Sequence, residues 1–409
     1  MTTHGRSLRE IAAHVTALSD LSDVAPDRQV ALGYHDTLRE IRQQPDTWRS
    51  TVRALEVERG RVRALIDPVV DAGPSGTILL TGSGSSSHLG TCLAPGLQAA
   101  TGVTVRSVPS GDLLTNPRAF VPSGLPCLVV SFGRSGDSPE SASVVERLIA
   151  LGNVRQLLVT CNARGRLATE SWSRRGMECV ILEERTNDRS LVMTSSVTNM
   201  LLAGWILIGD RDDREEQIDQ LATAGDIVTE RSAMALRDMV DRDTQRVVYL
   251  GTGTNFGAGV ESALKMLEMT GGAVSTMVES FLGVRHGPMA AIDAATLVVG
   301  LLSDDGVRRA YETDLVEELG RKSLGRRRLL VGQRVDPRWL RPGDEVVQWD
   351  AEPPISDDLL CVIHVLVGQW LAFWRCTLEG CRPDAPSSGD VITRVVRPFR
   401  VHAPIAGRS

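Results

Sequence analysis

The sequence predicts an α/β protein made of two tandem three-layer αβα modules with parallel sheets, preceded by N-terminal helices. Two segments, 77–87 and 247–255, share one plan: an apolar run, a Gly-x-Gly turn and the start of a helix-like stretch. A further apolar run follows each segment, and it reaches Ser131 and Gly300, both 47 residues after the second glycine of the preceding turn. This shared register indicates an internal duplication. Fully apolar strands between helix-length segments are typical of parallel sheets covered on both faces.

The N-terminal part of the chain has a charged, helical pattern. One helix is expected to end near Gln44-Pro45, because proline disfavours helical backbone in the residue before it, and another is expected over 48–57. We therefore predict an N-terminal helical segment over 1–70. The first module is expected to follow over 71–215.

The remaining residues, 216–409, are predicted to hold a linker helix, the second module and a C-terminal tail. The linker helix is expected within the acidic stretch 210–246, and one or two closing strands after about residue 320. The apolar segment 359–379 contains His364 and Gln369, so it is predicted to be a buried helix rather than a membrane span.

Composition and charge exclude several classes of function. The chain has 409 residues, 42% hydrophobic and 23% charged, with a formal net charge of −6. A net-negative surface does not attract nucleic acid or an anionic membrane, so neither is expected as a partner. The polar start over 1–13 does not resemble a secretory signal, and the seven cysteines show no CxxC or Cys/His spacing. A cytoplasmic protein without a zinc site, another metal or a disulfide framework is expected.

The Gly-x-Gly turns do not match nucleotide-binding motifs. The dinucleotide fingerprint requires a third glycine, where this chain has Ser87 in the first turn and Phe256 in the second, and no acidic residue ends the next apolar run at 104–108. No GKS or GKT sequence is present either. NAD and ATP are therefore disfavoured, and no cofactor is predicted.

Clusters of hydroxyl side chains follow the predicted strands instead. The three clusters are Ser83 with 85–87, the loop 131–138, and 194–196. Helix N-termini present free N–H groups and a positive dipole end, and serine hydroxyls add donors. Three such clusters at one edge of a parallel sheet favour a phosphate monoester, although serine also caps helices without any ligand.

A helix with paired charges follows the second Gly-x-Gly turn. Glu261, Lys265 and Glu268 fall on one helical face, and Lys265 is one of only two lysines in the chain. This spacing is consistent with a solvated face carrying an ion pair, which periodicity alone favours, or with a general base beside a cation. His286, in an Arg-His-Gly-Pro sequence, is either a satisfied turn residue or an acid/base group suited to neutral pH.

Seven ordered segments resemble one family. They are 79–84, 130–141, 160–162, 187–190, 193–196, 282–288 and 394–396. Together they make the chain, over about residues 33–402, similar to the double sugar-isomerase-domain (SIS) proteins of the AgaS type, described as galactosamine-6-phosphate deaminase/isomerases or tagatose-6-phosphate ketose/aldose isomerases. The resemblance implies two flavodoxin-like SIS modules and an amino sugar phosphate as substrate.

The resemblance also implies roles for particular residues. By similarity to the isomerase half of glucosamine-6-phosphate synthase, Glu268 would move a proton between C1 and C2, Lys265 would support the site electrostatically, and His286 would assist ring opening from a partner subunit of a homodimer. The candidate substrate and phosphate ligands are Ser85, Ser86, Ser135, Ser138, Thr194, Ser195 and Glu261.

Departures from the synthase pattern keep alternatives open. Gly133 stands where the synthase has a phosphate-contacting serine, and the tail 401–409 has no counterpart of the synthase's C-terminal catalytic lysine. No N-terminal nucleophilic cysteine follows Met1, so ammonia from glutamine is not expected. The alternatives are a simple ketose/aldose isomerase, an etherase acting on N-acetylmuramic acid phosphate, or a non-catalytic sugar-phosphate sensor.

Overall fold

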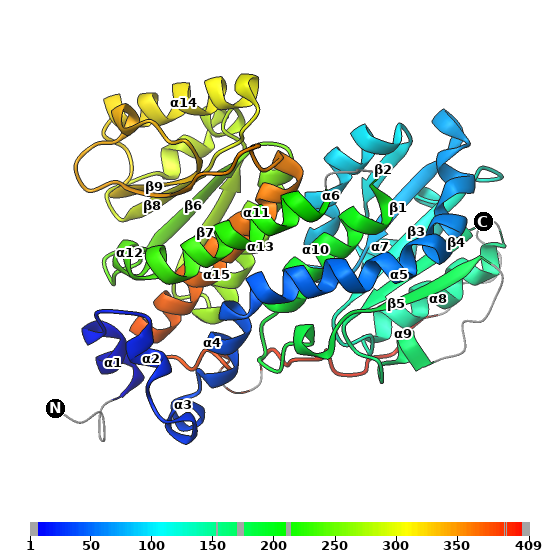
Figure 1. Ribbon diagram of the computed structural model, residues 1–409, viewed down its shortest axis with the longest axis horizontal. Helices are drawn as coiled ribbons and strands as arrows, with labels where there is room; N and C mark the ends of the chain where they lie inside the picture. The colour runs from blue at the N-terminus through cyan, green and yellow to red at the C-terminus, as the bar shows by residue number, and fades with distance from the viewer. Residues whose placement is uncertain are drawn as a thin grey trace.

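Two five-stranded sheets, each covered by helices, form the body of the protein (Figure 1). The structure is a computed structural model. It describes residues 7–152, 154–169, 176–209, 214–387, 389 and 391–402. The first four residues of the predicted linker stretch, 210–213, and the end of the tail, 403–409, therefore lie outside the described residues.

The two sheets have the same topology. The first contains β1 Thr77–Thr81, β2 Thr104–Ser107, β3 Cys127–Gly133, β4 Val154–Thr160 and β5 Met177–Ile181, in the order β2-β1-β3-β4-β5. The second contains β6 Arg246–Gly251, β7 Ser275–Glu279, β8 Thr296–Leu301, β9 Arg327–Gln333 and β10 Glu345–Trp349, in the order β7-β6-β8-β9-β10. All pairs are parallel. The predicted parallel sheets and closing strands are confirmed.

The duplication extends to the backbone of the Gly-x-Gly turns. Gly84 has φ 56° and ψ −130°, and Gly253 has φ 60° and ψ −124°. This region is accessible almost only to glycine, which explains why each turn carries one at that position. The two glycines lead into α6 Ser85–Thr101 and α13 Thr254–Met269.

Helices fill the N-terminal segment, as predicted. They are α1 Leu8–His14, α2 Ser19–Ser22, α3 Pro26–Leu32, α4 His35–Arg42 and α5 Gln44–Val70. The break between α4 and α5 falls at Gln43, beside the predicted Gln-Pro end. The second helix does not stop near residue 57, however, but continues to Val70, because apolar residues at helical spacing keep one of its faces buried along its length.

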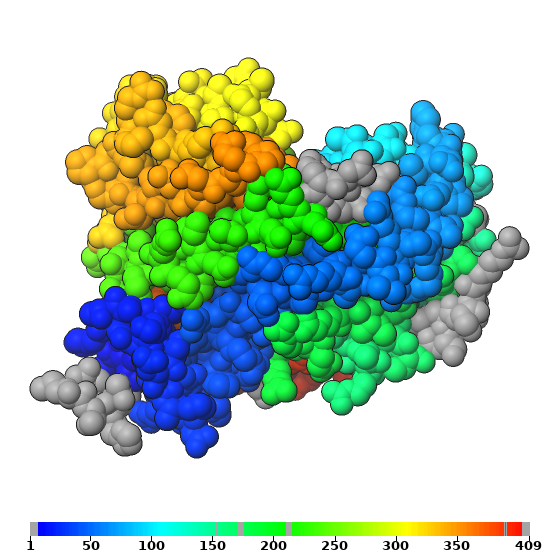
Figure 2. Space-filling view, viewed as in Figure 1, coloured from blue at the N-terminus to red at the C-terminus, as the bar shows by residue number. Residues whose placement is uncertain are grey.

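The remaining helices flank the sheets. The first module has α7 Ser110–Thr115, α8 Pro139–Leu151, α9 Arg166–Thr169 and α10 Ser195–Ile208. The second has α11 Arg214–Ile227, a π-helical turn Val228–Ser232, α12 Ala233–Met239, α13, α14 Gly306–Arg321 and α15 Asp357–Glu379. Single 3₁₀ turns cover Gly73–Ser75, Pro117–Ala119, Glu184–Thr186, Gly283–His286, Pro288–Ala291 and Pro337–Trp339. Helices α5 and α11 lie side by side on one face of the molecule (Figures 1 and 2).

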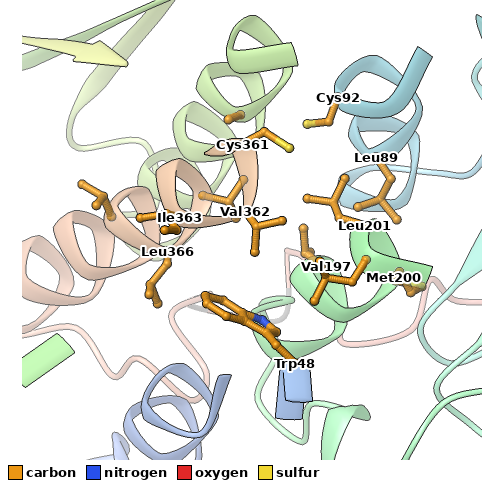
Figure 3. Close-up of a cluster of buried hydrophobic side chains, with 14 of the residues drawn as sticks. Trp48, Leu89, Cys92, Val197, Met200, Leu201, Cys361, Val362, Ile363 and Leu366 are labelled. Carbon is orange, nitrogen blue, oxygen red and sulfur yellow. The ribbon is translucent and has the colours of Figure 1, made fainter. Parts of the chain in front are cut away.

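The predicted buried helix is α15, at the centre of the molecule. Every residue from 359 to 377 is buried, and the helix packs on α13, α10 and α1. Figure 3 shows Val362 and Leu366 of α15 in one apolar cluster with Leu201 of α10 and Cys92 of α6. Among the described residues, α15 is the one helix long and apolar enough to cross a membrane, and its whole apolar window lies inside the protein.

The chain after α15 returns to the first module. Asp384 accepts hydrogen bonds from the backbone N–H and the hydroxyl of Thr37, both at 2.8 Å, and Leu191 N–H donates to the Asp384 carbonyl at 3.0 Å. Arg134, just after β3, donates to the carbonyl of Arg394. The tail therefore lies along the carboxyl edge of the first sheet, although the predicted boundaries place it in the same segment as the second module.

Candidate functional site

A cavity of about 510 Å³ opens where the carboxyl edge of the first sheet meets α13 and the tail. Its walls come from the turn after β1, the loop after β3, the segment before α10, α13 and the tail. The lining residues are Ser83, Gly84, Ser85, Arg134, Leu191, Met193, Glu268, Val391, Ile392, Thr393, Arg394, Val396 and Arg397. Ligands of open parallel sheets bind at this edge, so the cavity is the candidate active site.

Glu268 contributes a carboxylate to the cavity wall, and Lys265 fixes its position. The Lys265 ammonium lies 2.5 Å from Glu268 Oε2 and donates to Ser85 Oγ at 3.0 Å. Glu268 is about one-quarter exposed, whereas the Lys265 side chain is almost completely buried. The structure therefore brings together three predicted site residues that are up to 183 positions apart in the sequence, and it joins the first and second modules at this point.

The second carboxylate of the helix lies behind the lysine. Glu261 is buried, 3.4 Å from the Lys265 ammonium, and receives His88 Nδ1 at 2.8 Å. Burial alone would raise the pKa of Glu261, but Lys265 and His88 outweigh it and hold that pKa below its usual value. Burial would likewise lower the pKa of Lys265, but the Glu261 and Glu268 carboxylates outweigh it and raise that pKa. The lysine is therefore a permanent cation beside Glu268.

This arrangement corrects the interpretation that periodicity alone favoured. The face carrying Glu261, Lys265 and Glu268 is not a solvated face, because the first two residues are buried between the modules. A buried lysine is retained only where charges or acceptors compensate its desolvation, and here two carboxylates and a hydroxyl do so. Glu261 contacts Lys265 and His88 and is not part of the cavity lining.

The first two predicted hydroxyl clusters lie at the ends of neighbouring strands. Thr81 of β1 is the register partner of Ser131 of β3, so the loops that follow them meet at one edge. Ser85 lines the cavity, and Ser86 is the next residue of α6. Ser135 and Ser138 lie in the loop after β3. They are partly buried, outside the lining, and bind Asp137 N–H and Ser141.

The third cluster is already occupied by a protein carboxylate. Asp188 accepts the N–H groups of Thr194, Ser195 and Ser196 at 2.8 to 3.0 Å and the hydroxyls of Thr194 and Ser196. The Ser195 hydroxyl donates to the Glu40 carbonyl at 2.6 Å. All of these groups are fully buried. In this structure Asp188 therefore takes the place at the start of α10 where the sequence predicts a phosphate.

His286 lies apart from the cavity. It ends the 3₁₀ turn Gly283–His286 after β7, is exposed, and is not among the lining residues. Its neighbour Arg285 forms an ion pair with Glu318 at 2.7 Å. One copy of the chain thus does not bring His286 to Glu268, which leaves the predicted contribution from a partner subunit as a prediction.

Arginines make the cavity cationic, and they are the residues that the sequence prediction missed. Arg134 is buried, donates to the carbonyls of Ser190 and Leu191, and has a pKa that burial lowers to about 10. Arg394 and Arg397 come from the tail. Arg134 and Arg394 lie inside two of the seven segments that resemble the family. Their place in the cavity wall depends on the tail, which returns to the first module.

The structure also shows what a serine at Gly133 would contact. A Cβ on Gly133 would lie 3.2 Å from Leu167, so a serine there would displace that side chain slightly.

The equivalent edge of the second sheet has the opposite charge. A smaller cavity there is lined by Asp304, Asp305, Asp357 and Asp358, with Arg308 as a cation. The Asp357 carboxylate accepts from Ser303 and from Asp304 N–H. Such a surface repels a phosphate monoester. Among the described residues no group of three or more His, Cys, Asp or Glu side chains could hold a metal ion.

A buried carboxylate near the first sheet makes stability depend on pH. Burial, with the nearby Asp188 charge, raises the pKa of Glu40 to about 8. The unfolded chain loses this proton at a lower pH, so this group's contribution falls as pH rises toward 8, by at most about 1.4 kcal/mol per pH unit. Glu40→Gln is expected to reduce the loss of stability between pH 5 and pH 8, measured by urea unfolding.

The control for this experiment is Glu317→Gln on α14, where the carboxylate is half-exposed. That variant should keep the pH dependence of the unmodified protein. Equal pH profiles for Glu40→Gln and the unmodified protein would contradict the assignment.

The comparisons with known proteins agree with this geometry. A family profile described as SIS domain matches residues 74–209, which span the first sheet. The chain is 37% identical over 378 residues to an AgaS protein of Streptomyces coelicolor, covering 90% of this chain and 95% of the relative. It is 31% identical to D-galactosamine-6-phosphate deaminase AgaS of Escherichia coli, with the same coverage. The chain belongs to the AgaS family of SIS-domain proteins.

A solved structure supports the same assignment. The tagatose-6-phosphate ketose/aldose isomerase of Escherichia coli superposes with a TM-score of 0.78 at 29% identity, covering 89% of this chain and 97% of that one. The family resemblance seen in the sequence is thereby confirmed, and so is the fold of two SIS modules. As a family member, the chain is an enzyme.

Proposed function

We propose that this protein converts galactosamine 6-phosphate into tagatose 6-phosphate and ammonia. The observation that carries the proposal is the Glu268 carboxylate, held by a buried lysine in a cavity with three arginines at the carboxyl edge of a parallel sheet. The name of the Escherichia coli relative, a D-galactosamine-6-phosphate deaminase, supports the choice of substrate.

Each chemical step has a suitable group. In the open-chain aldose, Glu268 removes the proton from C2 and returns it to C1. The amino nitrogen gives up one proton and the C1 oxygen takes one up, so the amino aldehyde becomes a 2-imino sugar with a C1 hydroxyl group. Water adds to the C2 imine, and the C–N bond then breaks to release ammonia and leave the C2 ketone. One carboxylate can serve both carbons. The Lys265 ammonium holds the Glu268 carboxylate in place beside the cavity.

The proposed phosphate donors lie at the start of α6 and in the loop after β3, beside the cavity wall formed by Ser83, Ser85 and Arg134. The turn at Gly84 begins α6 at the cavity, and Ser86, Ser135 and Ser138 follow the ends of β1 and β3. Arg134 and Arg397 add positive charge to the same cavity. Helix N-termini and arginines are the groups that bind phosphate monoesters in proteins. Because Asp188 occupies the start of α10, Thr194 and Ser195 would bind phosphate only if that carboxylate moved.

A homodimer would complete the site. His286 is exposed and outside the cavity, so a second copy of the chain is needed to place an imidazole beside the substrate ring. An imidazole is suited to ring opening because its pKa lies near neutral pH. The proposed setting is the cytoplasm, where phosphorylated sugars are formed and consumed.

The test is ammonia release from purified protein with galactosamine 6-phosphate and, in parallel, glucosamine 6-phosphate. We expect ammonia and tagatose 6-phosphate in equal amounts from the galacto epimer, and slower release from the gluco epimer. If neither compound releases ammonia in stoichiometric amounts, the proposal is contradicted. Ketose formation without ammonia would favour the simple isomerase, which the name of the solved Escherichia coli structure also suggests.

A further inference from the structure

A second, larger cavity lies beside the candidate active site. It has a volume of about 640 Å³ and is bounded by α4, the loop after β4 and the segment between β5 and α10. Five of its lining residues are arginines: Arg39, Arg164, Arg185, Arg189 and Arg394. It shares only Arg394 with the Glu268 cavity. The proposed reaction uses none of the other four arginines.

Two of these arginines are neutralised by nearby carboxylates. Arg39 pairs with Asp36 at 2.7 Å, and Arg185 pairs with Asp46 at 2.6 Å. The other three have a long ion pair or none among the described residues. Arg164 reaches Glu184 only at 3.9 Å, and both side chains are largely exposed. The Arg189 side chain has no ion pair within the described residues.

Arg394 is held without being neutralised. Its guanidinium donates to the Asp188 carbonyl at 2.6 and 2.8 Å and to Asn187 Oδ1 at 2.9 Å, all of which are uncharged acceptors. The acidic residues in the lining are Glu184 and Glu40. Burial and the nearby Asp188 charge raise the pKa of Glu40 to about 8, despite the hydrogen bonds that it accepts from Arg189 N–H and Ser190 N–H, so it adds little negative charge at pH 7. Arg189 and Arg394 therefore give the cavity a net positive charge in a protein of net charge −6.

From this charge and size we infer that the arginine-lined cavity binds a small polyanion carrying a diphosphate or two phosphate groups, separately from the sugar-phosphate substrate. Arginines spread over several elements match two anionic groups better than one, because each guanidinium binds phosphate oxygens in a bidentate manner. A ligand there would contact Arg394, whose other face lines the Glu268 cavity, and this residue gives the two sites a physical connection.

The experiment is calorimetric titration of the full chain with inorganic pyrophosphate at fixed ionic strength, and separately with galactosamine 6-phosphate. The test variant is Arg164→Glu with Arg189→Glu, and the matched control is Arg321→Glu, an exposed arginine on α14. We expect the double variant to bind pyrophosphate at least about tenfold more weakly than the control. Its affinity for galactosamine 6-phosphate should change by less than about threefold.

Two results would overturn the inference. Equal pyrophosphate affinity in the double variant and in Arg321→Glu would show that the arginines do not form a site. A parallel loss of pyrophosphate and galactosamine 6-phosphate binding would show that the cavity belongs to the substrate site. Failure of the proposed function gives a different pattern, because the unmodified protein would then not bind galactosamine 6-phosphate, whereas the pyrophosphate difference would remain.

Discussion

Glu268→Gln is expected to lower kcat for galactosamine 6-phosphate by about 10²- to 10⁴-fold, the usual contribution of a positioned general base. The amide has the shape of the carboxylate, and its oxygen can still accept a hydrogen bond from Lys265. Lys265 also keeps its contacts with Ser85 Oγ and Glu261. The amide cannot accept the proton from C2. The dissociation constant of the sugar phosphate should therefore change by less than about threefold, measured by calorimetry beside steady-state ammonia release.

The matched control is Glu261→Gln, on the same helix and beside the same lysine. Glu261 is buried and outside the cavity, so replacing its charge should mainly lower the free energy of unfolding. The reason is that the buried Lys265 ammonium would then have one carboxylate partner instead of two. If Glu268→Gln keeps near-normal kcat, or if Glu261→Gln lowers kcat as much with unchanged stability, Glu268 is not the base.

The fold could be predicted because its signals are local and repeated. An apolar run, a glycine turn and a helix recur in both halves, and the turn requires glycine because Gly84 and Gly253 adopt a backbone conformation closed to other residues. The helix expected over 48–57 is part of a longer helix, α5, which extends to Val70. Its burial depends on partners that are distant in sequence, such as α10 and α11, and a short amphipathic window contains no information about them.

The candidate site was predictable only in part, for the same reason. The Glu261–Lys265–Glu268 spacing identifies one helix face, but it does not show whether that face meets solvent or another module. The contact of His88 with Glu261 joins residues 173 positions apart, and no sequence pattern marks it. The hydroxyl cluster 194–196 indicates a helix start, and α10 does begin there, at Ser195. Whether a phosphate or a protein carboxylate occupies that start depends on Asp188, whose position the chain alone does not reveal.

Asp188→Ala is expected to cost about 3–5 kcal/mol in the free energy of unfolding. The carboxylate accepts three backbone N–H groups and two hydroxyls at the start of α10, and all five donors are buried. Each buried donor left without an acceptor costs about 1–3 kcal/mol, reduced where water or a neighbouring group replaces the lost partner. Asp188→Asn, which keeps one acceptor oxygen, should fall between the alanine variant and the unmodified protein in urea unfolding.

Asp305 provides the matched control, because it caps α14 with the same chemistry at the surface. Its carboxylate accepts Val307 N–H and Arg308 N–H, but water can replace it there, so Asp305→Ala should cost much less than Asp188→Ala. Equal costs for the two alanine variants would mean that the start of α10 is solvated in the unmodified protein. The N-terminus of α10 would then be open to a phosphate after all, and Thr194 and Ser195 would return as candidate ligands.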